Sequence, residues 1–425
     1  PLAQTNGPVK VEIRGGHGGY QLWVDQRPFY IKGAGLGNSD PATLAAAGAN
    51  SMRTWQSSRL LLDRAQANGL YVTLGLDVAR ERQGFNYNDP AAVARQKERI
   101  RQEVLKYKDH PALIIWAIGN ELNLNATNAR VWEAVNELSK MIHALDPNHL
   151  TTTPLAGFNE ETVETVQRLA PDLDLISLQM YADVVRLPHY LAESRWTGPY
   201  LLTEWGATGH WEVGKTAWGA PLEDNSSVKA AAYKKRYETA IAVDTKRCLG
   251  SYVFLWGHKQ ERTPTWYGVF LDSGETTEAV EVMQYLWTGE WPASRCPELA
   301  GAWLDGRRAN QNIHLRVGGK FPAKVSVTGA KATDLAYSWE VLEESRETKV
   351  GGDHEDRPRH LPGLVQTGPD GTATVAAPDQ PGAYRLFAYI RDGHGHAAHA
   401  NIPFYVDAVT QPAGDQKAAP AQRHD

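Results

Sequence analysis

The chain has 425 residues, 42% hydrophobic and 22% charged, with a formal net charge of −5 and a sequence pI near 6.3. This balance gives no basic surface for nucleic acid or for an anionic membrane. No apolar run approaches the roughly 20 residues that span a bilayer. The length suits two or three domains, or one large barrel with an accessory module.

The first 28 residues predict short strands. VKVEIRG (9–15) is followed by YQLWVDQRPFYIKG (20–33), which we interpret as a hairpin turning at Asp25 and Gln26. The chain begins at Pro1, which is compatible with a removed leader peptide. We therefore expect a periplasmic or secreted protein, and a cytoplasmic location stays open.

From residue 29 to residue 292, strand-like apolar runs alternate with helical patterns eight times. One helical face carries Val131, Val135, Leu138, Ile142 and Leu145, at intervals of three and four residues. Buried strands separated by amphipathic helices predict a parallel sheet, and eight such units favour a closed (β/α)8 TIM barrel, with an open doubly wound sheet as the alternative. The predicted strands are 29–35, 49–55, 70–78, 113–121, 150–154, 174–181, 200–206 and 250–258.

Residues 297–408 show a different pattern, in which apolar residues alternate with period 2 between turn signals such as GPDG and PDQPG. We predict a small antiparallel β-sandwich, in which LAYSWEV and PGAYRLFAYIRDG resemble immunoglobulin-like accessory modules. The boundary falls near residues 287–297, and the polar residues 409–425 are expected to be disordered.

Cys248 and Cys296 are the only two cysteines. The barrel prediction puts both at its N-terminal face, which leaves two alternatives open, a disulfide or two buried free thiols. His-rich and acidic segments at 351–360 and 392–399 are read as solvated turns, so no metal site is assigned. KGAGLGN (32–38) does not match the dinucleotide-binding spacing, and no GxSxG motif occurs.

Two glutamates end predicted barrel strands. Glu121 ends the fourth strand, in LIIWAIGNE, and Glu204 ends the seventh, in YLLTEWG. Because the carboxyl ends of barrel strands meet at one face, we expect both side chains to face one cavity. A pair of carboxylates across a cavity is what cleavage of a glycosidic bond requires. Their separation would distinguish retention from inversion of the anomeric centre.

Other strand ends supply candidate helpers. Arg53 could hold one carboxylate ionised, Asn120 and Tyr181 offer hydrogen-bonding groups, and Trp256 offers a flat face. The long loop at 203–227 adds further aromatic side chains. The remaining candidates for contact with substrate are Trp55, Trp205, His210, Trp211, Glu212, Trp218, Trp266 and Tyr267.

The segments FYIKGAG, GANSMRTW, WAIGNE and LLTEWG resemble glycoside hydrolase clan A, closest to the catalytic barrel of family 2 glycosidases. The resemblance covers about residues 28–290 and implies that Glu121 is the acid/base, Glu204 is the nucleophile and the mechanism is retaining. It further implies that Arg53 and Tyr181 orient the nucleophile, Asn120 contacts the sugar 2-hydroxyl and Trp256 floors the −1 subsite. Fewer than 30 residues precede the barrel here, where family 2 enzymes usually carry two β domains. Asp77 stands at the end of strand three where many clan members offer a histidine, and it receives no role.

The sequence thus predicts a retaining β-glycoside hydrolase that acts on a β-linked glucan or related oligosaccharide and needs no cofactor. Its partner would be an oligosaccharide or polysaccharide. One alternative is a transglycosylase that uses the same two glutamates. Another, of a different class, is a carbohydrate-binding barrel without catalysis.

Overall fold

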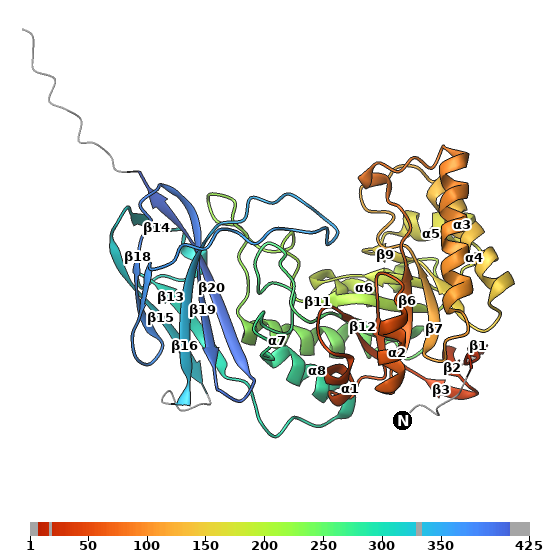
Figure 1. Ribbon diagram of the computed structural model, residues 1–425, viewed down its shortest axis with the longest axis horizontal. Helices are drawn as coiled ribbons and strands as arrows, with labels where there is room; N and C mark the ends of the chain where they lie inside the picture. Colours follow the sequence, from red (N-terminus) through yellow and green to blue (C-terminus); the bar gives the residue numbers. More distant parts are fainter. Residues whose placement is uncertain (1–6, 17–18, 329–333, 409–425) are drawn as a thin grey trace, which may run out of the picture.

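The computed structural model describes residues 7–16, 19–328 and 334–408. The tail at 409–425, for which disorder is predicted, lies outside this range, as do residues 1–6. A barrel and a two-sheet β domain lie side by side (Figure 1). Within the described ranges, no helix combines the length and the apolar character needed to cross a bilayer.

The barrel is a ring of parallel strands in the order β8-β7-β6-β5-β4-β12-β11-β10-β9. Segments β8 and β9 form one passage of chain interrupted at Thr153, which is the predicted fifth strand; β8 pairs with β7 and β9 pairs with β10. The ring therefore closes, and the TIM-barrel prediction is confirmed over the open sheet. The strands are β4 (Ile31–Leu36), β5 (Ser51–Arg53), β6 (Tyr71–Leu76), β7 (Leu113–Ile118), β8 (Leu150–Thr152), β9 (Pro154–Ala156), β10 (Ile176–Gln179), β11 (Tyr200–Gly206) and β12 (Cys248–Trp256).

Helices cover the outside of this ring, and their ends follow local sequence signals. For example, Asp89 caps α3 by accepting hydrogen bonds from the backbone N–H groups of Ala91 and Ala92, and Pro90 fills the first helical position. The helices are α1 (Pro41–Ala46), α2 (Arg59–Ala67), α3 (Pro90–Tyr107), α4 (Arg130–Leu145), α5 (Glu160–Leu169), α6 (Leu187–Glu193), α7 (Ser226–Arg236) and α8 (Glu278–Thr288), with shorter turns η1 (Glu81–Gln83), η2 (Ala182–Arg186) and the π-helix η3 (Tyr237–Ile241).

A small antiparallel sheet, β1 (Val11–Gly16), β2 (Gly19–Val24) and β3 (Arg27–Phe29), lies at the N-terminal end of the barrel. The predicted hairpin turn is present, since Asp25 and Gln26 both have positive φ, as a two-residue hairpin turn requires. Leu22 packs in one cluster with Ile114 and Leu201 of the barrel. The sheet thus covers the barrel floor, opposite the end where the two glutamates lie.

The C-terminal domain consists of two four-stranded sheets, in the orders β13-β15-β18-β17 and β14-β20-β19-β16, with buried apolar side chains from both sheets in a shared core. All pairs are antiparallel except β14 with β20, so the prediction of a wholly antiparallel sandwich is wrong at that edge. The immunoglobulin-like assignment stays a prediction. The elements are β13 (Glu298–Leu304), η4 (Ala309–Gln311), β14 (Ile313–Arg316), β15 (Lys320–Thr328), β16 (Ala336–Glu343), β17 (Val365–Thr367), β18 (Thr372–Ala376), β19 (Gly382–Arg391) and β20 (Ala397–Asp407).

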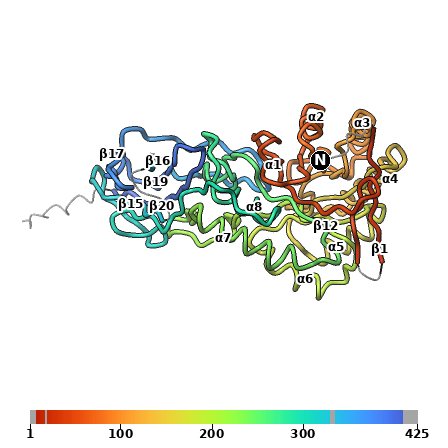
Figure 2. Tube along the Cα trace, turned by 90° about the horizontal axis from the view of Figure 1, so that it is seen from below, coloured from red at the N-terminus to blue at the C-terminus, as the bar shows by residue number. Residues whose placement is uncertain are grey.

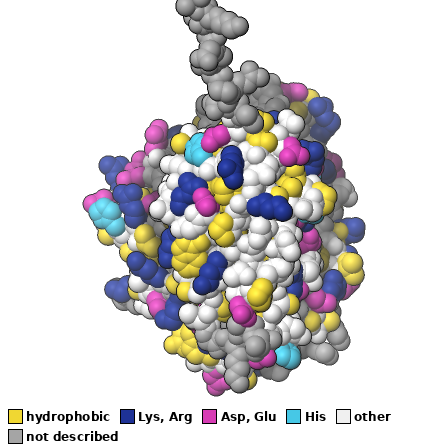
Figure 3. Space-filling view, turned by 90° about the vertical axis from the view of Figure 1, so that its left-hand side faces the viewer, with side chains coloured by type: hydrophobic (Ala, Val, Ile, Leu, Met, Phe, Trp, Pro, Cys, Tyr) yellow, Lys and Arg dark blue, Asp and Glu magenta, His cyan; other side chains and the backbone are white. Residues whose placement is uncertain are grey.

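Acidic and basic side chains are interspersed over the end of the molecule that this domain forms (Figure 3). That face shows no broad surface of a single charge. The domain's opposite side packs on α7 through β13 and β20, and α8 packs on α7. Both helices lie between the barrel sheet and the sandwich (Figures 1 and 2).

A buried polar network joins the two domains. The carboxylate of Glu223 accepts hydrogen bonds from Lys229 Nζ and from Asn401 Nδ2 of β20, both at 2.5 Å. Arg385 of β19 donates to Asn401 Oδ1 at 2.7 Å and to the carbonyl of Pro221 at 2.8 Å. These directed bonds form together only when the two domains are docked in this position, so the network fixes the sandwich against the barrel.

Both cysteines are free and buried. Cys248 begins β12 at the barrel floor, as predicted. Cys296 lies at the opposite end, because its backbone N–H bonds to Glu281 near the start of α8 and its thiol contacts the carbonyl of Thr276. The prediction that both thiols share one face is therefore wrong: the chain runs back along α8 before it enters β13. The structure gives no disulfide to indicate an oxidising compartment.

Candidate active site

Glu121 follows β7 through a tight turn of the backbone. Gly119 has φ of 76° and Glu121 has φ of 50°, and the Glu121 N–H donates to the carbonyl of Pro154 at 3.0 Å. A positive φ is uncommon for glutamate and persists only where surrounding contacts hold it. The turn explains how an apolar strand ends in a carboxyl group that faces the cavity.

Glu204 lies near the end of β11 and its carboxylate accepts four hydrogen bonds. Arg53 Nη1, Trp55 Nε1 and Gln179 Nε2 donate to Oε1 at 2.7, 3.0 and 3.0 Å. The Tyr181 hydroxyl donates to Oε2 at 2.8 Å. All four groups donate, so both oxygens of the Glu204 side chain act as acceptors and are fixed in position.

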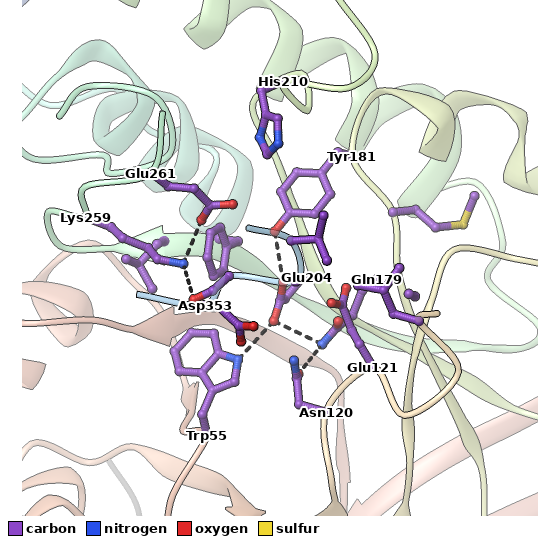
Figure 4. Close-up of a pocket in the computed structure, with 18 of the residues that line it drawn as sticks. Trp55, Asn120, Glu121, Gln179, Tyr181, Glu204, His210, Lys259, Glu261 and Asp353 are labelled. Carbon is purple, nitrogen blue, oxygen red and sulfur yellow. Dashed lines mark hydrogen bonds and ion pairs between the residues drawn. The ribbon is translucent and has the colours of Figure 1, made fainter. Parts of the chain in front are cut away.

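Asn120 is held in the same network. Its Oδ1 accepts from Arg53 Nη2 at 2.6 Å and from Gln179 Nε2 at 2.8 Å. With Oδ1 occupied, the amide nitrogen of Asn120 is left to donate to a bound molecule (Figure 4). Arg53 itself is 1% exposed and lies beneath the cavity, joining Glu204 to Asn120.

Glu121 has a contrasting environment. Burial, and next the negative charge of Glu204, raise the pKa of Glu121 to about 8, while Arg82 and Arg53 oppose the shift. No described residue donates a hydrogen bond to its carboxyl group. At neutral pH, Glu121 therefore keeps its proton. A carboxyl group that keeps its proton, beside a second one whose oxygens only accept hydrogen bonds, can supply a general acid and a nucleophile or base.

Both glutamates line one cavity of about 760 Å³ at the carboxyl end of the barrel. This volume lies in the range typical of small-molecule sites. Figure 4 shows Glu121 and Glu204 close together among hydrogen-bonding side chains. Trp211 stands at the rim with 58% of its surface exposed. The predicted residues that line this cavity are Trp55, Asn120, Glu121, Tyr181, Glu204, His210, Trp211 and Glu212.

Trp256 does not line the cavity, which corrects the prediction that it floors a sugar subsite. It is fully buried, packs against Phe270 and Trp287, and donates to the hydroxyl of Thr43. The register of β12 shifts between Val253 and Trp256, which breaks the simple alternation of faces. Phe254 and Leu255 line the cavity instead.

Trp205 also lies outside the cavity, in a second correction. It follows Glu204 on β11, so its side chain points to the opposite face of the strand, where it is fully buried against Tyr233 and Tyr237. Trp218 packs against Tyr405 of β20, and Trp266 is buried. These aromatic residues serve packing rather than contact with a ligand.

His210 and Glu212 lie on the loop after β11. The hydroxyl of Tyr267 bonds to the N–H and to Nδ1 of His210 at 3.1 and 2.9 Å. Burial lowers the pKa of His210 to about 4, so the ring is neutral. Glu212 accepts from the N–H groups of Ala182, Asp183 and Gly209 at 2.7–3.0 Å, which ties this loop to the end of β10.

Three features of the cavity were not predicted. Gln179 bonds to both Glu204 and Asn120; it occupies a strand end, so the rule that found Tyr181 could have found it. The pair Lys259 and Glu261, joined at 2.6 Å, lines one wall. Residues 350–353 of the C-terminal domain line the rim, and no sequence signal relates that segment to the barrel.

The segments rich in histidine and acids do not form a metal site among the described residues, where no three ligating side chains converge. His396 bonds to Asp392 at 2.6 Å and His354 lies 3.3 Å from Asp356, each within one turn. Asp77 is 52% exposed in its side chain and lies outside the cavity.

Comparison with known proteins agrees with this geometry. Residues 38–247 match the family model described as glycosyl hydrolases family 2, TIM barrel domain. A probable mannan endo-1,4-beta-mannosidase C of Aspergillus terreus is 30% identical over 21% of this chain and 26% of that protein. This chain therefore spans about a quarter of the length of that curated relative.

Several solved structures share the fold at low identity. A β-glucuronidase of Bacteroides uniformis has a TM-score of 0.51 at 15% identity, over 93% of this chain and 48% of that chain. A β-glucuronidase of Bifidobacterium dentium has a TM-score of 0.52 at 18% identity, over 67% and 50%. A putative β-galactosidase of Bacteroides fragilis has a TM-score of 0.50 at 15% identity, over 94% and 57%.

A closed barrel with two carboxyl groups at its carboxyl end is the arrangement that many glycoside hydrolases use. The barrel of this chain, over residues 38–247, is of the family 2 glycosyl hydrolase kind.

Proposed function

We propose that this protein is a retaining β-glycoside hydrolase acting on a β-linked glucan or related oligosaccharide. The observation that carries the proposal is the different surroundings of the two carboxyl groups. Glu204 accepts four hydrogen bonds as a carboxylate, while burial and the charge of Glu204 raise the pKa of Glu121 to about 8. The relatives above are named for β-glycosidic bonds, which supports a β-linked substrate.

The reaction would proceed in two displacements. In the first, Glu121 gives its proton to the glycosidic oxygen as that bond breaks, and a Glu204 oxygen bonds to the anomeric carbon. The leaving sugar departs as an alcohol. In the second, the ionised Glu121 takes a proton from water as the water oxygen attacks the same carbon and Glu204 is released as a carboxylate. Two inversions at one carbon retain its configuration.

The surrounding donors would position the nucleophile. Arg53, Trp55 and Tyr181 fix both oxygens of Glu204, so that attack requires little reorganisation. The free amide nitrogen of Asn120 is suited to donate to a sugar hydroxyl next to the anomeric carbon. Such a bond could strengthen as charge develops on the sugar ring.

The direct test uses a 2-deoxy-2-fluoro aryl β-glycoside, which forms a glycosyl-enzyme that hydrolyses slowly. We expect mass spectrometry to find the label on the peptide containing Glu204, and NMR to show the β-anomer as the first product of an unmodified substrate. Glu204→Gln should abolish turnover with the fold retained, while Glu133→Gln, an exposed position on α4, serves as the control. A first product with inverted configuration would overturn the mechanism. Sugar binding without labelling or turnover would favour a non-catalytic barrel.

Transglycosylation by the same two residues is a second candidate, favoured by Trp211. Its ring is 58% exposed at the rim of the cavity, a position suited to stack on an acceptor sugar. Product analysis at high oligosaccharide concentration distinguishes the two reactions, because transfer yields products longer than the substrate. If Trp211 binds an acceptor, Trp211→Ala should lower the ratio of transfer to hydrolysis.

A further inference from the structure

The loop that joins β16 to β17 leaves the sandwich and reaches the barrel cavity. Residues 350–353 of this loop line the cavity together with the ends of the barrel strands. Val350, a large hydrophobic residue, is 38% exposed there. The C-terminal domain therefore forms part of the wall around the two glutamates.

Several contacts hold this loop on the barrel. Lys259 Nζ donates to the carbonyl of Gly352 at 3.1 Å, and Arg262 donates to the carbonyl of Lys349 at 2.9 Å. The backbone N–H of Arg262 donates to the buried carboxylate of Glu355 at 2.6 Å. Anchors on both sides of residues 350–353 give the segment a defined position at the cavity.

Asp353 is the acidic side chain of this wall. Its Oδ1 accepts from Gln83 Nε2 at 2.9 Å and from Arg82 Nη2 at 3.4 Å. No described residue donates to its Oδ2, and the side chain keeps 33% of its surface exposed. Figure 4 shows the carboxylate of Asp353 directed into the cavity. Barrel residues thus hold one oxygen while the other can accept from a bound molecule.

The cations that line the cavity are already engaged. Lys259 pairs with Glu261 at 2.6 Å. Arg80 donates to the carbonyl of Asn120 at 3.2 Å and to Gln83 at 3.4 Å. Among the described lining residues, these two are the only lysine or arginine. Glu204 and Asp353 are each paired with one arginine, Arg53 at 2.7 Å and Arg82 at 3.4 Å. A sugar carboxylate would therefore find no unpaired cation among the described lining residues, and it would approach two carboxylates of its own sign.

We propose that Asp353 is a specificity residue supplied by the C-terminal domain, which accepts a hydrogen bond from a hydroxyl of an uncharged sugar and disfavours uronic acids. This inference rests on the proposed glycosidase activity. It assigns the C-terminal domain a direct part in the choice of substrate. It also separates this chain from the β-glucuronidases that share its fold.

The test compares matched aryl β-glycosides that differ only at C6, namely 4-nitrophenyl β-glucoside with the β-glucuronide, and the β-galactoside with the β-galacturonide. We expect the wild-type enzyme to prefer the uncharged member of at least one pair by about 10–100-fold in kcat/KM, because the pairing with Arg82 reduces the effect of a like charge about 4 Å away. Asp353→Asn should raise KM for the uncharged substrate several-fold and reduce the discrimination at least tenfold.

Asp356→Asn is the matched control, because it removes the same charge from the same loop at a position 88% exposed in its side chain and outside the cavity. This variant should behave as wild type in both comparisons. Should Asp353→Asn fail to fold, Asp353→Glu moves the charge by one methylene and is expected to raise KM for the uncharged substrate.

The outcomes separate this inference from the proposed function. Efficient cleavage of a uronide, at a rate equal to or above that of its uncharged partner, would overturn charge selection while leaving the glycosidase activity intact. Unchanged KM and unchanged discrimination in Asp353→Asn would overturn the role of Asp353. Failure to cleave or bind any member of the panel and of a β-linked oligosaccharide set would overturn the proposed function itself.

Discussion

Replacing Glu121 by glutamine should stabilise the protein at high pH and leave its stability nearly unchanged at low pH. Burial and the charge of Glu204 raise the pKa of Glu121 from an ordinary value of 4.5 to about 8 in the folded state. Below pH 4.5 the group is protonated in both the folded and the unfolded chain, so it makes no pH-dependent contribution. Above pH 4.5, Glu121 is ionised in the unfolded chain but still protonated in the folded protein. Folding must then take up a proton, which lowers the free energy of unfolding as the pH rises.

The resulting loss in the free energy of unfolding grows by about 1.4 kcal/mol per pH unit and reaches up to about 5 kcal/mol at pH 8 and above. Glutamine carries no charge at any pH and avoids this penalty. The free energy of unfolding of Glu121→Gln minus that of wild type should therefore rise between pH 4.5 and 8.5, by several kcal/mol.

Urea unfolding of both proteins at pH 4.5, 6.5 and 8.5, with thermal melts as a second measurement, checks this prediction. Other titrating groups are common to the two proteins and cancel in the difference. Glu133→Gln, at an exposed position of α4, controls for the substitution itself. A difference that does not change with pH would refute the reasoning, because it would show that Glu121 ionises as readily in the folded protein as in the unfolded chain.

Three further predictions test activity and stability. In wild type, kcat/KM should fall above about pH 8 as Glu121 loses the proton it donates, and a basic limb several units lower would contradict that assignment. Tyr181→Phe removes the 2.8 Å hydrogen bond to Glu204 and should lower kcat/KM by about 10–100-fold with the melting temperature nearly unchanged. Activity equal to that of wild type would show that this bond does not assist attack by Glu204. Lys229→Met leaves the buried Glu223 without its cation and should reduce the free energy of unfolding by about 3–5 kcal/mol, as measured by urea unfolding. A loss smaller than about 1 kcal/mol would show that the remaining hydrogen bonds suffice to stabilise the buried carboxylate.

The alternation of apolar strands and amphipathic helices was sufficient to predict the barrel, because each buried strand must be covered on both faces. The same rule located Glu121, Glu204, Asn120 and Tyr181 around one cavity, since the ends of parallel strands share a rim. Local rules also predicted the hairpin turn at Asp25. These features depend on contacts between neighbours in the chain or in the barrel.

The errors have identifiable physical reasons. Trp256 was misplaced because a register shift in β12 interrupts the alternation of faces, and sequence gives no sign of that irregularity. The wrong prediction that Trp205 contacts substrate could have been avoided from the sequence. Trp205 follows Glu204 directly on the same strand, so the two side chains must face opposite ways. The predicted position of Cys296 was wrong because the chain reverses after α8 and returns alongside it, which brings this residue to the opposite end of the barrel from Cys248. The contact of residues 350–353 with the barrel depends on how two domains pack, which no periodic pattern encodes.

The arrangement of the loop between β16 and β17 bears on how such enzymes diversify. A recombination that kept this barrel and exchanged the appended module would replace one wall of the cavity while leaving both glutamates in place. Under the proposed function, substrate preference would then change through mutations in the module alone, with Glu121 and Glu204 untouched. Selection for a new sugar would then act on two largely separate parts of the gene, one encoding the barrel and one encoding the appended module.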